Sequence, residues 1–293
     1  MLSIAGGILL GLLVGSFLNV VIYRIPIMME NEWRAHCREL MSGQPFTAGS
    51  AIAETSLPEP FNLVQPRSRC ANCGTMVTAW QNIPVVSWLW LGGKCANCKA
   101  SISARYPIIE ILTGVLSGLV VWKFGITIES GAALALTWTL IALTMIDIDH
   151  QLLPDNITYP LLWLGLTFSL LQQPGSASPF PDLQSSIIGA IAGYLSLWSV
   201  YWIFKLATGK EGMGYGDFKL LAALGAWLGW QMLPLIIMLS ALVGAIVGIG
   251  MILFLGRDRQ IPIPFGPYLA GAGLIAMFWG TQISNGYFSF SGI

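Results

Sequence analysis

Charged side chains are scarce in this chain of 293 residues, which has 14 basic and 14 acidic side chains. Only 10% of the residues are charged, whereas a soluble globular domain averages about 25%. This shortage excludes an ordinary soluble protein. The net charge is zero, so there is also no excess of either sign that would indicate nucleic acid as a partner.

A basic segment at the amino terminus is also lacking. A cleaved signal peptide needs positive charge before its apolar stretch, but the first basic residue here, Arg24, follows the apolar run 2–22. We therefore predict that this run is a retained membrane span.

What is abundant is apolar sequence: 55% of the residues are apolar and twelve are tryptophan, and the mean hydropathy is +0.70. A membrane-spanning helix needs about 20 apolar residues, and tryptophan collects at membrane interfaces. The apolar runs lie at 2–22, 107–124, 131–147, 157–172, 185–204, 218–231, 234–255 and 264–283. We predict an all-α polytopic membrane protein with about eight transmembrane helices, two of which (157–172 and 218–231) are short.

The basic residues indicate how these spans are oriented. If the amino terminus lies outside the cytoplasm, the loops 23–106, 148–156, 205–217 and 256–263 face inward. These loops and their flanks hold every basic residue except Lys123: Arg24, Arg34, Arg38, Arg67, Arg69, Lys94, Lys99, Arg105, Lys205, Lys210, Lys219, Arg257 and Arg259. This bias predicts a cytoplasmic location for them. The domains expected are a first transmembrane helix (1–22), a cytosolic domain (23–106) and a seven-helix membrane domain (107–293).

The cytosolic segment contains two C-x-x-C pairs, Cys70/Cys73 and Cys95/Cys98, separated by 21 residues. Paired knuckles of this kind are typical of a structural zinc site, in which four thiolates close the tetrahedral shell. Two disulfides or a redox pair are the alternatives, but stable disulfides are rare in the cytosol. Cys37 has no partner at zinc spacing. We predict a small zinc-ribbon-like insert.

Two aspartates border the apolar runs. Asp147 ends the run 131–147, and Asp217 follows a glycine-rich turn, Gly212 to Gly216, before the run 218–231. A carboxylate beside hydrocarbon is costly and indicates catalysis, a proton relay or transport. The predicted topology places both on the cytoplasmic face. If they meet, they share one proton, so that one can activate water while the other protonates a carbonyl.

Structural alternatives exist for these acids. Asp217 can serve as a helix cap. Asp155, after Pro154, is expected to be the N-cap of the next helix, and His150 a solvated loop residue. Asp149 lies only two residues after Asp147, but Asp147 is the better candidate for a membrane-edge acid because it borders the apolar run. At the level of function, a proton-coupled transporter and a non-catalytic zinc-bearing assembly factor remain open.

Several motifs resemble one known family, the prepilin leader peptidases. They are Gly15 to Arg24, the stretch from Pro66 to Glu110 with both cysteine pairs, Asp147 seven residues before Pro154, and Gly214-Tyr-Gly-Asp-Phe-Lys219 as a GxGDxK motif. The resemblance implies a bacterial inner-membrane aspartic peptidase with Asp147 and Asp217 as its catalytic pair. It also implies prepilin and pseudopilin substrates, whose new amino terminus is methylated from S-adenosylmethionine.

The resemblance does not locate the methyl-donor site. The string Gly271-Ala-Gly-Leu-Ile-Ala276 fits a G-x-G-x-x-A pattern, but it has no preceding strand and is more simply a helix-packing face. Similar small-residue spacings occur at Gly11/Gly15, Gly114/Gly118, Gly189/Gly193, Gly225/Gly229 and Gly244/Gly248. The hypothesis at this point is a pocket on the cytosolic side, near the zinc ribbon, where the product amine emerges.

Overall fold

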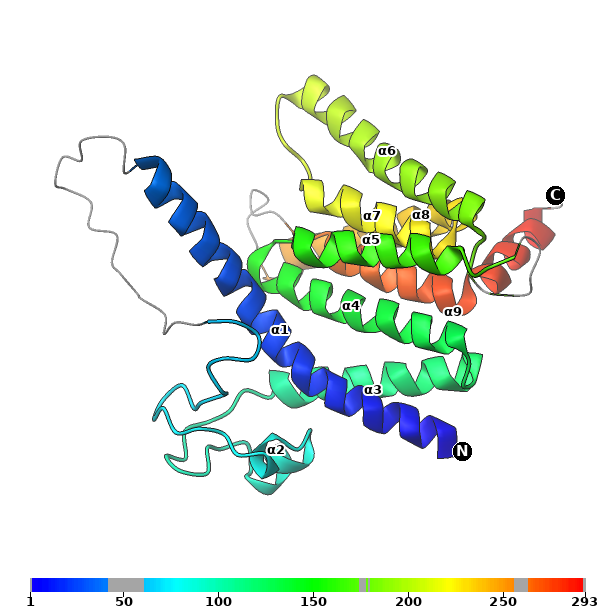
Figure 1. Ribbon diagram of the computed structural model, residues 1–293. Coiled ribbons are helices and arrows are strands. Elements are labelled where there is room, and N and C mark those ends of the chain that lie inside the picture. Colours follow the sequence, from blue (N-terminus) through cyan, green and yellow to red (C-terminus); the bar gives the residue numbers. More distant parts are fainter. Residues whose placement is uncertain (1, 42–60, 174–177, 179, 256–262, 292–293) are drawn as a thin grey trace. The chain divides into compact units, whose positions relative to one another are not determined.

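We obtained a computed structural model of the chain (Figure 1), which describes residues 2–41, 61–173, 178, 180–255 and 263–291. The chain divides into two compact units, Met1–Gly118 and Leu119–Ile293. Residues 42–60 of the predicted cytosolic segment, and Arg257 and Arg259 of the charge pattern, lie outside the described residues.

The described residues are helical apart from short loops and two isolated β-bridges in the cysteine insert. The long helices are α1 (Leu2–Met41), α3 (Arg105–Phe124), α4 (Ile128–His150), α5 (Asp155–Ser169), α6 (Leu183–Thr208), α7 (Tyr215–Leu228), α8 (Leu233–Leu255) and α9 (Gly266–Ser291). Each of the eight predicted apolar runs is therefore a helix, and the all-α prediction is confirmed. Five stretches are long and apolar enough to cross a membrane: Leu2–Leu40, Arg105–Phe124, Ile128–His150, Leu183–Thr208 and Trp230–Phe254.

In the first unit, α1 is longer than the predicted run 2–22. A helix of 40 residues is about 60 Å long, twice the thickness of a hydrocarbon core. Its second half is polar and carries an exposed ion pair in which Arg34 contacts Glu30 at 2.6 Å. The helix therefore continues well beyond the membrane without a break at residue 22.

α1 and α3 pack closely because glycines remove side chains from their contact. A methyl group on Gly11 would lie 2.5 Å from Oγ of Ser117, and one on Gly15 would lie 2.8 Å from Cα of Glu110. Small residues allow such close approach where the hydrophobic effect cannot drive association within lipid. The predicted packing role of this glycine pair is confirmed.

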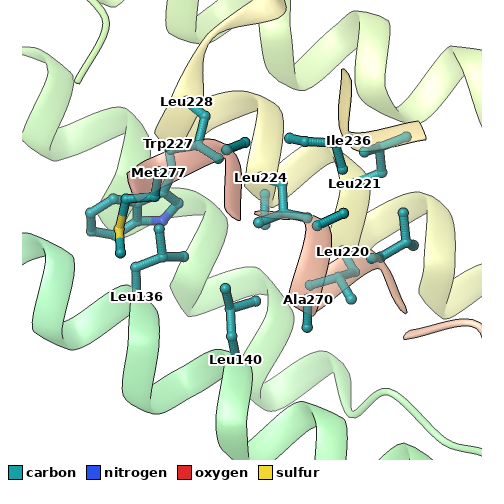
Figure 2. Close-up of a cluster of buried hydrophobic side chains, with 14 of the residues drawn as sticks. Leu136, Leu140, Leu220, Leu221, Leu224, Trp227, Leu228, Ile236, Ala270 and Met277 are labelled. Atoms are coloured by element: carbon teal, nitrogen blue, oxygen red, sulfur yellow. The ribbon is translucent and has the colours of Figure 1, made fainter. Parts of the chain in front are cut away.

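The second unit is built around α7. Of the residues from Asp217 to Leu228, all except Lys219 are buried, and the helix contacts α5, α6, α8 and α9. Figure 2 shows Leu220, Leu224 and Trp227 of α7 beside Leu136 of α4 and Met277 of α9. The stretch from Leu220 to Leu228 is apolar because protein surrounds it. With 14 residues, α7 is about 21 Å long, shorter than a hydrocarbon core.

The tightest helix contact is between α6 and α7. A methyl group on Gly189 would overlap the carbonyl oxygen of Gly225, and one on Gly193 would lie 2.6 Å from the carbonyl oxygen of Leu221. Ser186 Oγ also donates to the carbonyl of Ala226. The two backbones touch, which fixes the position of α7 and of the aspartate at its start.

We predict that Gly189→Ala will force α6 and α7 apart and lower the melting temperature in detergent. Overpacking of this kind typically costs about 1–3 kcal/mol. The matched control is Gly131→Ala on α4, where no atom lies within 4 Å of the added methyl group and alanine should be neutral or slightly stabilising. Equal melting temperatures for the two variants would contradict this account of the contact.

Candidate functional site

Asp147 and Asp217 both lie in the second unit, and both are buried, with 5% and 7% of their surface exposed. Asp147 lies in the last turn of α4 and Asp217 in the first turn of α7. The two carboxylates are near enough for the charge on Asp147 to act on Asp217. Both predicted residues are therefore buried at helix ends within the same unit, whereas Asp149 and His150 are exposed. His150 is the last residue of α4 and not a loop residue as predicted.

Asp147 is held by a residue that the sequence did not reveal. Its Oδ2 accepts a hydrogen bond of 3.0 Å from the backbone N–H of Gly266, which is the first residue of α9. The first N–H groups of a helix have no partner inside the helix, and the helix dipole favours negative charge there. The amino terminus of α9 therefore binds the carboxylate at the end of α4.

Gly266 has to be glycine in this arrangement. A methyl group at that position would lie 2.7 Å from Oδ2 of Asp147 and 3.2 Å from the side chain of Leu153. Leu153 also packs against Gly216 of the GxGD motif, where a methyl group would lie 2.7 Å from its Cβ. Leu153 thus lies between the two glycines and couples the α4–α5 connection to both α7 and α9.

Asp217 is the third residue of α7, and the N-cap of that helix is Gly214, which has no side chain to offer. The Asp217 carboxylate reaches back to a backbone hydrogen bond with Gly214, as the acidic residue of a capping box does. Asp217 therefore supports the start of α7, as the cap alternative expected, and it also lies within reach of the charge on Asp147. The cap role and the predicted pairing of the acids are compatible with each other.

Asp155 has a different role from the one expected. The N-cap of α5 is Pro154, so the prediction that Asp155 caps the helix is wrong. Its carboxylate instead accepts two bonds from Lys219 Nζ, at 2.6 and 2.8 Å. This ion pair joins the first residue of α5 to the second turn of α7. Asp155 lies eight residues after Asp147, and Lys219 lies two residues after Asp217. The lysine of the GxGDxK motif thereby fixes α7 against α5.

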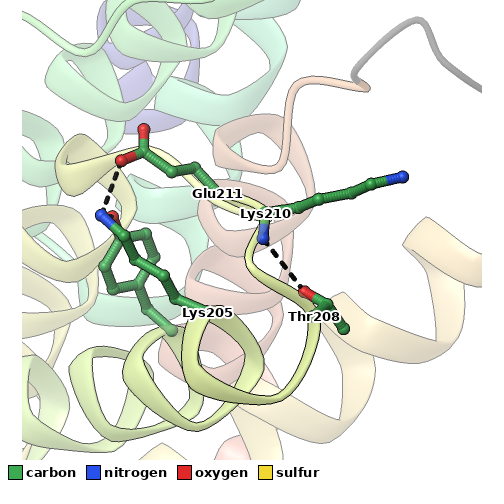
Figure 3. Close-up of polar contacts among 5 residues, drawn as sticks. Lys205, Thr208, Lys210 and Glu211 are labelled. Atoms are coloured by element: carbon green, nitrogen blue, oxygen red, sulfur yellow. Dashed lines mark hydrogen bonds and ion pairs between the residues drawn. The ribbon is translucent and has the colours of Figure 1, made fainter.

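The glycine-rich turn before Asp217 is tethered at its start. Lys205 of α6 binds Glu211 at 2.8 Å, and the backbone N–H of Lys210 donates to Thr208 (Figure 3). The bond to the Lys205 ammonium lowers the pKa of Glu211, so the carboxylate stays ionised at neutral pH. Gly209 ends α6 with a φ of 71°, a conformation that glycine adopts without strain.

In the first unit, Cys70, Cys73, Cys95 and Cys98 form one cluster, with all four sulfurs within 4.8 Å of one another. None is in a disulfide. The Sγ atoms of Cys70 and Cys98 are 3.8 Å apart, and those of Cys73 and Cys95 are 4.0 Å apart. The cluster can hold a metal ion with four thiolate ligands. Cys37 is exposed on α1 and is not part of it.

The two knuckles repeat with an offset of 25 residues. The bridge between Arg69 and Met76 recurs between Lys94 and Ser101. The left-handed residue that follows each pair is Gly74, with a φ of 68°, in the first knuckle and Lys99, with a φ of 60°, in the second.

Each knuckle also supports the sulfur atoms of the other. Asn72 Nδ2 is 3.6 Å from Cys98 Sγ, and Asn97 Nδ2 is 3.8 Å from Cys73 Sγ. Hydrogen bonds to the hydroxyl and backbone of Thr75 lower the pKa of Cys73 to about 6. That thiol is therefore largely a thiolate at neutral pH, the form that binds metal.

The glycine-containing string from Gly271 to Ala276 lies inside α9. A methyl group on Gly273 would lie 2.6 Å from the side chain of Leu224 on α7. This position is a helix contact, as expected.

Comparison with known proteins agrees with the site. The model of the bacterial peptidase A24 N-terminal domain matches residues 9–124, and that of the type IV leader peptidase family matches residues 134–249. The chain belongs to the type IV leader peptidase family. The two aspartates and the cysteine cluster fall within the matched regions, so the resemblance drawn from the motifs is confirmed and the chain is an enzyme of this family.

The relatives are similar along almost the whole chain. A protein of Stutzerimonas stutzeri and one of Pseudomonas aeruginosa are each 55% identical, over 97% of this chain and 93% of the relative. One of Aeromonas salmonicida is 56% identical, over 96% of this chain and 92% of the relative. All three are named prepilin leader peptidase/N-methyltransferase. No solved structure matches the chain.

We predict that Gly266→Ala will lower the peptidase activity by about 10–100-fold, because the added methyl group displaces the Asp147 carboxylate and a misplacement near 1 Å can cost this much. The matched control on the same helix is Gly271→Ala, which has no atom within 4 Å of the new methyl group and should retain full activity. Both proteins should be compared as purified, folded samples by initial rates. Unchanged activity in Gly266→Ala would show that this contact does not position the acid.

Proposed function

We propose that this protein cleaves the leader peptide of prepilins and of type II secretion pseudopilins by means of Asp147 and Asp217, and then methylates the new amino terminus. The observation that carries the proposal is that two buried carboxylates, one from α4 and one from α7, lie within electrostatic reach of each other, in a chain about 55% identical to enzymes named for both reactions. The protein would lie in the bacterial inner membrane, with its amino terminus in the periplasm and its acids on the cytoplasmic side.

The proposed domains follow from this membrane orientation. Residues 1–22 would form the first transmembrane helix, residues 23–106 the cytosolic zinc-binding domain, and residues 107–293 the seven-helix peptidase domain. The basic residues support this orientation, because nearly all of them flank the segments placed on the cytoplasmic side.

The cleavage step needs one ionised and one protonated acid. The ionised carboxylate takes a proton from water as the oxygen attacks the scissile carbonyl, and the protonated carboxyl gives its proton to the carbonyl oxygen. Collapse of the tetrahedral intermediate then breaks the C–N bond, and the leaving amine takes up a proton. Two carboxylates that share a site hold one proton between them, which would supply one acid in each of the two required forms.

The second step uses S-adenosylmethionine as the methyl donor. Cleavage frees an α-amino group with a pKa near 8, which loses its proton before its nitrogen attacks the methyl carbon of the sulfonium. The C–S bond breaks and the thioether product leaves. The four cysteines would not take part, because their ligand set leaves no open position on a bound ion.

We predict that Asp147→Asn and Asp217→Asn will each abolish leader cleavage, lowering it by at least about 10³-fold, because neither variant can hold the shared proton. Both proteins should still insert into membranes and should methylate a substrate supplied without its leader. Mass spectrometry of the substrate's amino terminus measures both outcomes. Asp149→Asn is the control and should cleave normally.

An Asp217→Asn protein that cleaves at the normal rate would favour the purely structural cap. If proton transport were lost in these variants while leader cleavage continued, the transporter alternative would replace this proposal.

We further propose that the metal in the cysteine cluster is zinc and that it is structural. In a tetrahedron with Zn–S bonds of 2.3 Å the sulfurs are about 3.8 Å apart, and the Cys70–Cys98 and Cys73–Cys95 sulfur distances, 3.8 and 4.0 Å, are close to this value. Four thiolates also match the preference of zinc. The ion would organise a segment with few buried apolar residues, since the η1 turn (Trp80–Asn82) and α2 (Val86–Trp90) have none.

We predict that Cys73→Ser will reduce zinc from one ion per chain to a small fraction and will lower the melting temperature by several degrees, because metal binding contributes directly to folding. Elemental analysis and thermal denaturation check this. Cys37→Ser is the matched control and should keep both values. A stable Cys73→Ser protein that has verifiably lost its metal would refute the structural role.

A further inference from the structure

The cysteine insert, residues 61–104, is fastened to α1 and α3 at both of its ends within the first unit. Arg24 of α1, only 7% exposed, donates to the backbone oxygens of Asn62 at 2.6 Å and Pro66 at 2.5 Å. Asn19 Nδ2 donates to the carbonyl of Tyr106 at 3.2 Å, which joins α1 to the first turn of α3 directly after the insert. The insert therefore starts on Arg24, near the end of the apolar run of α1, and ends where α3 begins, so both of its ends lie at the membrane boundary.

A third contact reaches further along α3. The backbone N–H of Val85 donates to Oε2 of Glu110 at 2.7 Å, and Glu110 is buried, with 8% of its surface exposed. Glu110 is the sixth residue of α3, about 7–8 Å along the helix from Arg105. The interfacial zone on each side of a bilayer is about 5–8 Å thick. If Arg105 lies at the outer edge of this zone, Val85 is held at the depth where headgroups meet acyl chains, and α2 begins at the next residue.

The backbone at this contact is strained. Val85 has a φ of 59° and a ψ of −49°, and Val86 N–H bonds to the carbonyl of Pro84 at 2.5 Å, which makes a three-residue turn of the rare kind. A positive φ is an outlier for a β-branched residue, and such strain persists only where the surroundings impose it. The turn sets the direction in which α2 leaves Glu110.

α2 (Val86–Trp90) presents an apolar face that the described residues leave uncovered. Val86, Leu89 and Trp90 have exposed fractions of 54%, 64% and 87%, and their spacing puts them on one side of the helix. Trp88, on the other side, turns inward and donates to the carbonyl of Ile102 at 3.2 Å. Trp80, just before α2, is 81% exposed. Tryptophan and leucine on one face are typical of a segment at a membrane interface.

The charge of the insert is of one sign. From residue 61 to residue 109 the sequence contains no aspartate or glutamate, and its basic residues are Arg67, Arg69, Lys94, Lys99 and Arg105. Basic residues near an anionic bilayer surface contribute about 1 kcal/mol each. The same charge disfavours a basic peptide on this surface, so lipid headgroups are the complementary partner.

We propose that the exposed face of α2, together with Trp80, is an interfacial anchor that docks the cysteine insert onto the bilayer crossed by α1 and α3. Leu89 and Trp90 lie among the upper acyl chains, and the basic residues of the insert contact anionic headgroups. This role is independent of the peptidase chemistry and concerns a surface that the proposed catalytic groups do not use.

The test is a depth measurement on the full-length protein in nanodiscs of phosphatidylcholine and phosphatidylglycerol in equal amounts. A nitroxide is attached at Leu89→Cys in a Cys37→Ser background, and its exposure to dissolved oxygen is compared with its exposure to a water-soluble nickel chelate. The reference is the same label on native Cys37, in the polar half of α1. Zinc content verifies that the insert is folded, and Cys37→Ser alone shows that the metal-binding cysteines take no label.

The expected result is a ratio of oxygen to nickel exposure several-fold higher at residue 89 than at residue 37. Nanodiscs of phosphatidylcholine alone should lower that ratio, because the headgroup attraction is lost. An equal ratio at the two positions would overturn the proposal, and an unchanged ratio without anionic lipid would overturn its electrostatic part. Two other outcomes would show that something other than lipid covers this face of α2. Spin–spin broadening of the label at residue 89 would indicate that a second copy of the chain covers it. Shielding of the label from the nickel chelate only after substrate is added would indicate that the substrate covers it.

Discussion

A carboxylate at the edge of hydrocarbon must find its hydrogen-bond donors within the protein, because lipid provides none. For Asp147 that donor is the first backbone N–H of α9, 119 residues away in the sequence. The contact requires a residue without a side chain at position 266. It also brings α4 and α9 close to α7, because Leu153 packs against Gly266 on one side and against Gly216 of α7 on the other. The arrangement of the second unit follows from accommodating this acid.

The sequence predicted the helices well because their apolar runs are long and are bounded by glycine, proline and charge. It predicted Asp147 and Asp217 because carboxylates beside such runs are rare. It could not reveal Gly266, since a glycine between two prolines indicates only a turn, and its partner is distant in the chain. The pairing of Asp155 with Lys219 was missed for the same reason: a local pattern suggested a cap, and a long-range contact prevailed.

The roles of the short helices were equally hidden from the sequence. An apolar run has the same composition whether lipid or protein surrounds it, so the sequence did not reveal that α7 is the buried centre of its unit. The length of α1 was underestimated because its apolar pattern ends near residue 25, while its helical hydrogen bonding continues into a polar half. Hydropathy predicts where lipid is tolerated, but it does not predict where a helix stops.

In the cysteine insert, the asparagine of each knuckle lies beside a cysteine of the other knuckle. This arrangement determines when the cluster can be complete during synthesis. The support of Cys98 comes from Asn72 and that of Cys73 from Asn97, so neither half is complete alone. While the ribosome is still making the second half, the first pair of thiolates has only half of its ligand shell and none of its cross-bracing. The four-sulfur cluster with its cross-bracing asparagines therefore exists only after both halves of the insert have been synthesised.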